Sequence, residues 1–291
     1  MSTQVSTAFS QQYSSNVQLL LQQMDNPLEM AVETSSAVGK NVVVVEQVGA
    51  VNAVRRTTRH ADTPIVDTPH AKRWAAPFDY EVADLIDDQD KVRMLVELTS
   101  PYARNHAAAM ARACTDEIVA AFSGTAMTGE NGTTPQAANT AEVVDTSGLT
   151  FVKLRAALLN LMAAEVDLDS DPLFCAIRAT QHDELLNITN GTNLITQSTD
   201  FNSTPVLVDG RIHRFMGINF IHTQRLLDDA NGDRLIPVWA KSGMHLVNFG
   251  SMKNEVTVRP DKSYSTQVYS GRTIGATRTE ENKVVLIACQ D

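Results

Sequence analysis

The segment KVRMLVELTSPYARNHAAAMARACTDEIVAAFSG, residues 91–124, shows the clearest periodicity in this chain. Small and apolar side chains recur there at steps of three or four residues, about 3.6 on average, which indicates one face of an α-helix. Ser100 followed by Pro101 is typical of an N-cap and a first-turn proline, so we expect a short helix near 90–98 and a long one over 101–122. Gly124 is the expected stop. The periodic positions are Val92, Val96, Thr99, Ala103, Ala107, Met110, Cys114, Ile118 and Ala121.

The residues before this segment fall into two parts. Residues 1–39 lack Lys and Arg but carry an apolar stripe at helical spacing, formed by Phe9, Tyr13, Val17, Leu20 and Met24. Asn26 and Pro27 predict a second, short helix that ends near Gly39. From residue 41 onward β-branched residues dominate and Gly49 interrupts them, which favours extended strands. We therefore expect a polar helical arm that docks on another surface, followed by a hairpin.

The hairpin region is basic, whereas the residues behind it are acidic. Residues 51–80 contain five Lys or Arg against three Asp and few apolar residues, so this region cannot bury itself and must project. Its basic residues are Arg55, Arg56, Arg59, Lys72 and Arg73, and Trp74 follows as a flat apolar anchor. Six acidic side chains then crowd into residues 79–90, namely Asp79, Glu81, Asp84, Asp87, Asp88 and Asp90.

The stretch RHADTPIVDTPHAKRW, residues 59–74, raises the question of a metal site. It contains two imidazoles and two carboxylates, a donor set that binds first-row metals, in His60, Asp62, Asp67 and His70. Each proline biases the residue before it toward extended geometry, which keeps the four side chains from converging. We therefore favour a solvated hairpin with Asp-Thr-Pro turns, and a metal-dependent enzyme that uses these four residues is the less favoured alternative.

The second half of the chain changes from helix to strand. Residues 124–140 have the composition of a flexible loop. A helix follows in GLTFVKLRAALLNLMAAEVD, with a predicted core face of Phe151, Leu154, Leu158, Leu161 and Met162. PLFCAIRAT predicts a buried strand, and QHDELLNI a short helix. Strands dominate after Pro205, in RIHRFMGINFIHT, RLIPVWA, GMHLVNF, NEVTVRP, STQVYSG and ENKVVLIAC. The fold class is α+β, with helices early and antiparallel strands late.

Composition narrows the class of function. The formal charge of −10 makes a surface that repels nucleic acid. The three cysteines are scattered in apolar settings, so we expect neither a disulfide framework nor a thiolate zinc site, and a reducing cytoplasm is the natural compartment. No apolar run reaches the roughly 20 residues of a membrane helix, and no signal peptide is expected.

Motifs for catalysis are missing from the sequence. There is no nucleophile elbow, no phosphate-binding loop and no dinucleotide fingerprint, and the histidines lack the spacing that sets two ligands on one helical face. Asp228 and Asp229 lie beside Asn231 and Gly232, which favours turn residues over a catalytic pair. We expect no enzyme activity and no cofactor.

The order of parts resembles the major capsid protein of tailed bacteriophages, a fold shared with the herpesvirus capsid floor and with encapsulins. The resemblance extends over essentially the whole chain and is carried by VADLIDDQD (82–90), by RACTDEIVAAFSG with Arg112, Asp116, Ile118 and Gly124, and by FMGINFIHTQRL (215–226). It implies an amino-terminal arm over 1–40 and an extended loop hairpin over 41–80. A peripheral domain over 81–140 would contain the spine helix 101–122, an axial domain would cover 141–244, and 245–291 would return as strands of both.

The resemblance also implies partners. Family members assemble as hexamers and pentamers into an icosahedral shell around double-stranded DNA, and the mild repulsion of an acidic lining would let that DNA slide without sequence-specific contacts. A separate scaffolding protein is implied, because self-scaffolded members carry a much longer segment before the arm. A portal protein belongs to the same system, a decoration protein is left open, and no membrane is involved. Assembly would take place in the host cytoplasm, and the product would be the virion capsid.

In this resemblance the extended loop lies over a neighbouring subunit. We therefore expect contacts between copies that pair Arg55, Arg56, Arg59, Lys72, Arg73 and Trp74 with Asp84, Asp87, Asp88 and Asp90. An encapsulin-like nanocompartment shell, which encloses an enzyme instead of a genome, is the alternative function.

Overall fold

The structure is a computed structural model. It describes residues 22–59, 62–63, 65–87, 99–138, 141–143, 147–186, 189–190, 193–194, 207–208, 211–229 and 232–290. The chain forms two compact units, and each takes segments from distant parts of the sequence. Unit 1 contains Met1–Asp25, Asp79–Arg112 and Ser251–Arg272. Unit 2 contains Asn26–Phe78, Ala113–Gly250 and Thr273–Asp291.

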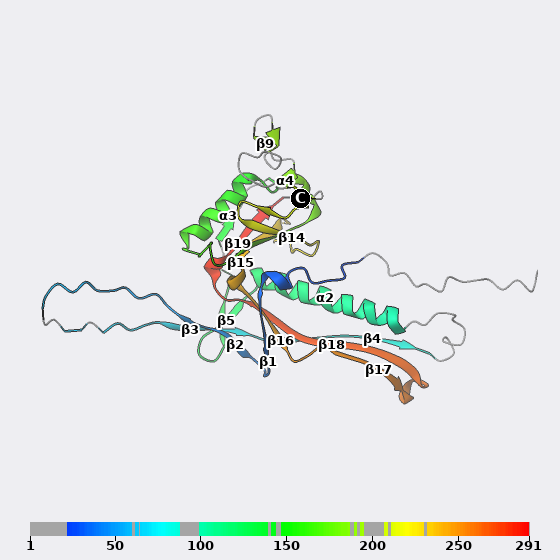
Figure 1. Ribbon diagram of the computed structural model, residues 1–291. Coiled ribbons are helices and arrows are strands. Elements are labelled where there is room, and N and C mark those ends of the chain that lie inside the picture. Colours follow the sequence, from blue (N-terminus) through cyan, green and yellow to red (C-terminus); the bar gives the residue numbers. More distant parts are fainter. Residues whose placement is uncertain are drawn as a thin grey trace, which may run out of the picture. The chain divides into compact units, whose positions relative to one another are not determined.

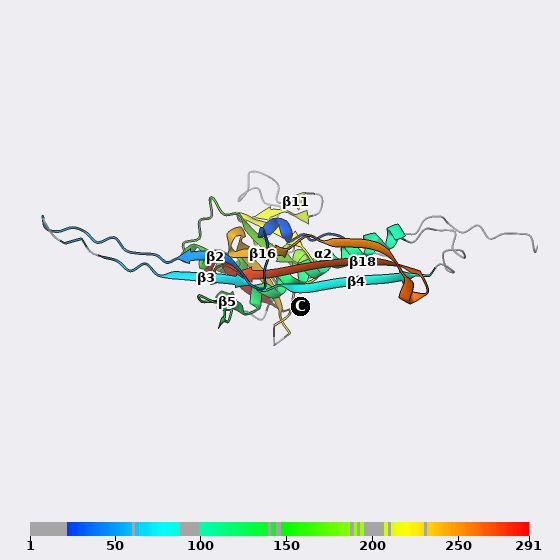
Figure 2. The same ribbon diagram turned by 90° about the horizontal axis from the view of Figure 1, so that it is seen from below.

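Three strands form the sheet of unit 1. Strand β17 (Lys253–Arg259) is antiparallel to the first part of β18 (Ser265–Arg278), and β4 (Phe78–Ile86) pairs with β18 as well (Figure 2). The 3-10 helix η5 (Pro260–Lys262) connects β17 to β18 through Ser263 and Tyr264, which both have positive φ. Burial alternates along β4, and the acidic side chains of this strand are at least partly exposed.

The long helix α2 runs from Thr99 to Ser123 and includes the whole predicted range of 101–122 (Figure 1). Gly124 donates its N–H to the Ala120 carbonyl at 2.9 Å, in agreement with the predicted stop. The predicted buried face is correct from Met110 through Cys114 to Ile118. It is wrong at Ala103 and Ala107, which are exposed, because alanine has too little apolar area to determine which face is buried. The short helix predicted near 90–98 lies almost entirely outside the described residues.

A six-stranded sheet forms the core of unit 2. Its order is β13 (Arg214–Phe215), β14 (Ile218–His222), β8 (Leu173–Ile177), β15 (Arg234–Ala240), β19 (Val284–Cys289) and β7 (Ala141–Val143). The predicted strands β8, β15 and β19 are confirmed, and the burial predicted for β8 holds at four of its five residues. All six residues of β19 are buried as well. The sheet is mixed, since β14 is parallel to β8 and β7 is parallel to β19, so the expectation of antiparallel late strands holds only in part.

Two tight turns of unit 2 form where the sequence places glycine. Met216 and Gly217 have φ of 52° and 81° between β13 and β14, the left-handed conformation that a two-residue hairpin requires. In the second turn, Asp229 accepts the backbone N–H of Asp233 at 2.9 Å, and Gly232 has φ of 90°. The prediction that Asp228 and Asp229 belong to a turn is confirmed.

Two helices of unit 2 follow the prediction in position. Helix α3 (Phe151–Ala163) begins at Thr150, whose hydroxyl accepts the Lys153 N–H, and α4 is Ala179–Leu186. The predicted core face of α3 is wrong at Met162, which is 55% exposed. Lys153 is buried instead and donates from Nζ to the carbonyls of Ser147 and Ala288, at 2.5 and 2.7 Å. A buried lysine can replace an apolar residue here because two carbonyls satisfy it.

A second sheet of unit 2 corrects the expected loop over 124–140. Strands β2 (Val42–Val48), β3 (His70–Ala75), β5 (Ala126–Thr128) and β6 (Thr134–Gln136) pair in that order, and all these pairs are antiparallel. The polar, glycine-containing composition of residues 124–140 is that of a hairpin turn. Its flanking strands β5 and β6 pair with each other, and β5 also pairs with β3. In both views β2 and β3 lie side by side (Figures 1 and 2).

The helix predicted after Asn26 is mostly wrong. Asn26 does accept the Leu28 N–H at 3.2 Å, but only a 3-10 turn, η2 (Glu29–Ala31), follows. Residues Glu33–Ala37 form strand β1, parallel to β16 (Met244–Phe249), which in turn pairs with the last residues of β18. Of the predicted stripe on the arm, only Met24 is described, and it lies outside any helix. The other four positions are outside the described residues.

The remaining elements are short. Strands β9 (Thr189–Asn190) and β10 (Asn193–Leu194) form one hairpin, and β11 (Leu207–Val208) and β12 (Arg211–Ile212) form another. The 3-10 helices η4 (Lys241–Gly243) and η6 (Glu281–Lys283) precede β16 and β19. Cys114, Cys175 and Cys289 are buried and form no disulfide with one another, and burial raises the pKa of Cys175. Within the described residues, no helix is both long and apolar enough to span a membrane.

Candidate subunit-contact surfaces

The hairpin loop, residues 49–69, joins β2 to β3 and is closed tightly at its base. Gly49 donates its N–H to the Pro69 carbonyl at 2.8 Å. A Cβ atom at position 49 would lie 2.5 Å from Cγ of Pro69, so a larger residue would force the two arms apart. Gly49 thus ends β2 at Val48, where the sequence predicted an interruption.

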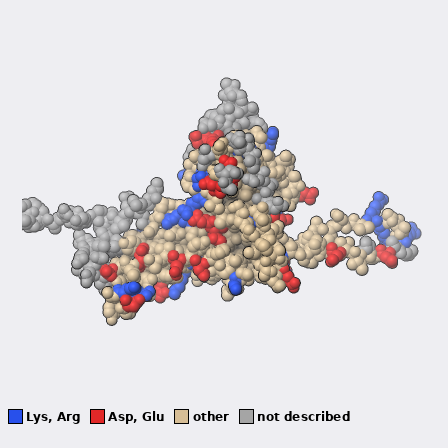
Figure 3. Space-filling view, turned by 180° about the vertical axis from the view of Figure 1, so that it is seen from behind, with Lys and Arg blue, Asp and Glu red and all other residues tan. Residues whose placement is uncertain are grey.

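Beyond its base the hairpin loop contacts little of its own chain. Each described residue from 50 to 67 is exposed, including Val54 at 65% and Ile65 at 97%. The basic residues Arg55, Arg56 and Arg59 lie on this exposed loop, and basic side chains gather toward its far end (Figure 3). Arg56 donates only to the Thr58 carbonyl nearby, at 3.0 Å. The loop therefore offers both apolar and basic side chains to another molecule.

Arg73 does not belong to this exposed surface, which corrects the prediction. Its side chain is 7% exposed, and its Nη1 lies 3.3 Å from Oε1 of Glu281. Arg278 donates from Nε to the same carboxylate at 2.8 Å, and from Nη1 to the carbonyls of Ala121 and Phe122 at the end of α2. Burial lowers the pKa of Arg73, and Glu281 partly opposes that shift.

Trp74 also anchors its own chain. Its indole N–H donates to the Gly129 carbonyl at 2.8 Å, and a Cβ at Gly132 would lie 2.7 Å from the ring. Trp74 therefore holds the hairpin of β5 and β6 against β3, and its side chain is only partly buried there. Lys72, by contrast, is partly exposed and pairs with Glu46 at 3.4 Å, a contact that contributes little in water.

The acidic surface lies on β4 in unit 1. Asp84 is 48% exposed and hydrogen bonds His106 at 2.8 Å, while Asp87 accepts a hydrogen bond from the Ser265 hydroxyl. Glu81 accepts from the Tyr269 hydroxyl at 3.4 Å. These contacts hold the carboxylates in place and leave part of their surface exposed. Asp88 and Asp90 lie outside the described residues.

Of the four residues considered as metal ligands, Asp62, Asp67 and His70 are exposed, and His60 is outside the described residues. Among the residues that the structure describes, no three His, Cys, Asp or Glu side chains come together as a metal site would require.

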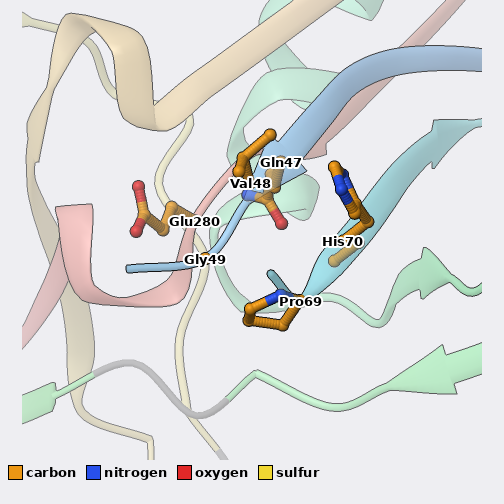
Figure 4. A pocket seen from close by; sticks show the side chains of 7 residues that line it. Gln47, Val48, Gly49, Pro69, His70 and Glu280 are labelled. Carbon is orange, nitrogen blue, oxygen red and sulfur yellow. The ribbon is translucent and has the colours of Figure 1, made fainter. Parts of the chain in front are cut away.

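A pocket of about 340 Å³ lies at the base of the hairpin loop (Figure 4). Its walls come from the two strand ends and from Glu280, and it is lined by Gln47, Val48, Gly49, Pro69, His70, Ala71 and Glu280. Gln47 donates to the Thr279 carbonyl at 2.5 Å, and Glu280 pairs with Lys283 at 3.2 Å. The lining contains one imidazole, from His70, and one carboxylate, from Glu280.

Comparison with known proteins agrees with this arrangement. The family model for phage capsid protein matches residues 5–291. The chain is similar to the capsid structure of cyanophage P-SCSP1u, with a TM-score of 0.75 and 15% identity over 99% of this chain and 94% of that chain. A structure from Mycobacterium phage Che8 gives 0.71 and 16%, with 96% of each chain covered. The capsid of the native GTA particle gives 0.70 and 10%, over 98% and 96%. No curated protein sequence matches the chain.

The solved structures, at these identities, establish the fold, which is that of a capsid subunit with α+β architecture, as predicted. The family model covers nearly the whole chain and establishes more: the chain belongs to the phage capsid protein family. It is a major capsid protein that forms the shell of the virion, and its role is structural.

Two residues that hold the base of the hairpin were missed by the sequence reasoning. Arg278 and Glu281 are more than 200 positions from Arg73 in the sequence, and nothing near them marks a buried ion pair. For their partner Arg73 the sequence does contain a signal of burial. Side chains alternate along β3, which places Lys72 and Arg73 on opposite faces of the strand.

Proposed function

We propose that this capsid protein assembles as hexamers and pentamers into an icosahedral shell that encloses the double-stranded DNA of a tailed phage. The observation that carries the proposal is the exposed hairpin loop, whose apolar residues Val51, Val54 and Ile65 have no core of their own. An exposed apolar surface of this kind marks an interaction site, and other copies of the chain are the available partners in a shell.

In this proposal the hairpin loop of one copy lies over its neighbour. Arg55, Arg56 and Arg59 supply positive charge, and Asp84 and Asp87 supply the complementary surface on the other copy. Lys72 is a peripheral member of the contact, and Asp88 and Asp90 extend the acidic run in sequence. Arg73 is left out, because it is buried in an ion pair with Glu281, whereas Trp74 is partly exposed and stays in the proposed contact.

The remaining parts of the proposal concern domains and partners. We assign residues 1–40 to the arm, 41–80 to the extended loop and 81–140 with α2 to the peripheral domain. Residues 141–244 form the axial domain, and 245–291 supply returning strands. A separate scaffolding protein and a portal protein take part in assembly, which takes place in the host cytoplasm. The net charge of −10 supports a shell that holds DNA without sequence-specific contacts.

Electron microscopy and mass photometry of the purified chain, with and without its scaffolding protein, test this proposal. The expected result is capsomer-sized oligomers or closed particles at micromolar concentration. A monodisperse monomer under both conditions would refute it. The contents of shells purified from the host decide between a phage capsid, which holds DNA, and a nanocompartment, which holds an enzyme.

A further inference from the structure

Helix α3 is apolar on two opposite sides. One side packs on the sheet of unit 2 through Leu154, Ala157 and Leu161, which are fully buried. The other side carries Val152, Leu159 and Met162, which are 60%, 64% and 55% exposed. Leu159 is seven residues after Val152 and three before Met162, so the three side chains lie on one face of the helix. Ala156 and Ala163 lie on the same face and make the stripe continuous.

A helix that is apolar all round is expected to be buried. The only charged residues of α3 are Lys153 and Arg155, and Lys153 is buried against two carbonyls. Arg155 is therefore the single charge on the exposed stripe. In the described part of the chain, the three apolar side chains of this stripe keep more than half of their surface exposed, so the stripe is open to contact with another molecule.

The charge of the stripe indicates which surface covers it. Two copies of α3 that packed stripe to stripe would bring Arg155 against Arg155, which disfavours a symmetric contact. A ring of identical copies instead uses two different surfaces of the chain, repeated around the ring. The partner surface must then be both apolar and acidic.

The turn between β14 and β15 has these properties. We define the acidic turn as the described residues 227–229 and 232–234, which contain three aspartates and one arginine. Leu227 is 45% exposed, and Arg234 already pairs with Asp228, so the turn keeps a net negative charge. Asp233 is bonded to Asp229 through its backbone, which leaves its carboxylate available.

We propose that the exposed stripe of α3 (Val152, Arg155, Leu159, Met162) binds the acidic turn of an adjacent copy. Leu159 packs against Leu227 of that copy, and Arg155 faces Asp233. The contact rests on the proposed assembly into rings of identical copies and is separate from the hairpin loop.

Disulfide trapping tests this contact directly. The three native cysteines are buried, so new surface cysteines will form the reactive pair. Leu159→Cys protein coassembled with Leu227→Cys protein should give a disulfide-linked dimer on mild oxidation, whereas either variant alone should stay monomeric under denaturing conditions. A dimer from Leu159→Cys alone would show that two α3 stripes pair with each other, and would overturn the proposal.

Charge exchange gives a second, independent readout. Arg155→Glu should raise several-fold the protein concentration needed for assembly, and the double variant Arg155→Glu with Asp233→Arg should restore it. Leu159→Gln keeps helix propensity and should also weaken assembly, while Leu159→Met is the matched control and should not. If wild-type rings form but none of these variants changes them, the α3 contact is wrong and the proposed function stands. If the wild-type chain stays monomeric, both fail.

Discussion

Glu281 lies between two buried arginines, and this arrangement ties three distant segments of unit 2 together. Its carboxylate contacts Arg73 on β3 and Arg278 on β18, and Arg278 continues to the last carbonyls of α2. All three side chains are 10% exposed or less. Two buried positive charges share one negative charge, so the carboxylate is the member whose removal costs most.

We predict that Glu281→Gln destabilises the protein by about 3 kcal/mol or more, because it leaves two buried guanidinium groups without a counter-charge. Urea denaturation followed by circular dichroism measures the change. Glu280→Gln is the matched control, since Glu280 is 50% exposed and pairs with Lys283 on the surface, and it should cost less than about 1 kcal/mol. Equal losses from the two variants would show that the buried network has no special role.

His222 is the second residue whose environment affects stability. Burial, followed by the neighbouring His182, lowers its pKa, and Arg211 and His213 add to the shift. The two imidazole rings meet edge to face with centroids 4.9 Å apart, and Nε2 of His222 is buried without a hydrogen-bond partner among the described residues. The folded protein therefore holds His222 neutral at a pH where the unfolded chain binds a proton.

The sign of the pH effect follows from this difference. The folded protein is stabilised by keeping His222 neutral, and this contribution is fully present above the ordinary histidine pKa of about 6.5. It is lost as the pH falls from there toward the lower pKa that His222 has in the folded protein. We predict a lower melting temperature near pH 5 than near pH 7.5, and a smaller difference in His222→Phe, which keeps an aromatic contact with His182. His70→Gln, at an exposed position and not among the groups that shift the pKa of His222, is the control. An unchanged pH difference in His222→Phe would contradict the assignment.

The residue scale also shows what the sequence could not reveal. Counting charges placed Arg73 and Lys72 together on a positive rim, but β3 alternates, so Lys72 stays partly exposed and Arg73 is buried. Attention to that alternation would have separated them. The partner Glu281 could not have been found in this way, because an ion pair between residues so far apart depends on the folded topology.

At the scale of elements, helix α2 is the part that periodicity predicted best. Apolar residues with large side chains, such as Met110 and Ile118, located its buried face, while the alanines did not. Strands β5 and β6 were missed because their loop has glycine and threonine in abundance, and their pairing depends on Trp74 and Gly132 fitting together. Strand β1 was missed because it forms only by pairing with β16, more than 200 residues later.

Continuity of α2 gives a prediction at this scale. Ala109 lies in the middle of the helix, and Ala109→Pro would remove a backbone hydrogen bond and clash with the preceding turn. We expect a loss of about 3 kcal/mol or more and no recovery of soluble, assembling protein. Ala107→Gln, at an exposed position two residues earlier, should fold and assemble normally. Soluble, assembling Ala109→Pro protein would show that α2 is not required as one helix.

At the scale of the whole molecule, the exposed surfaces carry the function. The hairpin loop, the acidic strand β4 and the stripe of α3 each present groups that a single copy leaves uncovered. The sequence predicted the first two from charge and composition, whereas the third required the helix to be seen in its packed position. In our proposal these groups find their partners on other copies in the assembled shell.

The hairpin loop arginines provide the decisive prediction. Single exposed ion pairs contribute only about 0 to 1 kcal/mol, so one charge change should do little. Changing Arg55, Arg56 and Arg59 to Glu together would place like charges at every copy of the contact, and the penalty is repeated throughout the shell. These side chains are exposed, and among the described residues the contact of Arg56 with the nearby Thr58 carbonyl is the one hydrogen bond they make, so the fold should be unaffected.

We therefore expect the triple variant to keep the circular dichroism spectrum and melting temperature of the wild type but to form no closed shells in electron microscopy. High salt should reduce the defect, because screening shortens the reach of the repulsion. Changing the same three residues to Lys keeps the charge and is the matched control, which should assemble. Normal shells from the Glu variant would show that these arginines do not contact a neighbouring subunit. A Glu variant that unfolds would show instead that they stabilise their own chain.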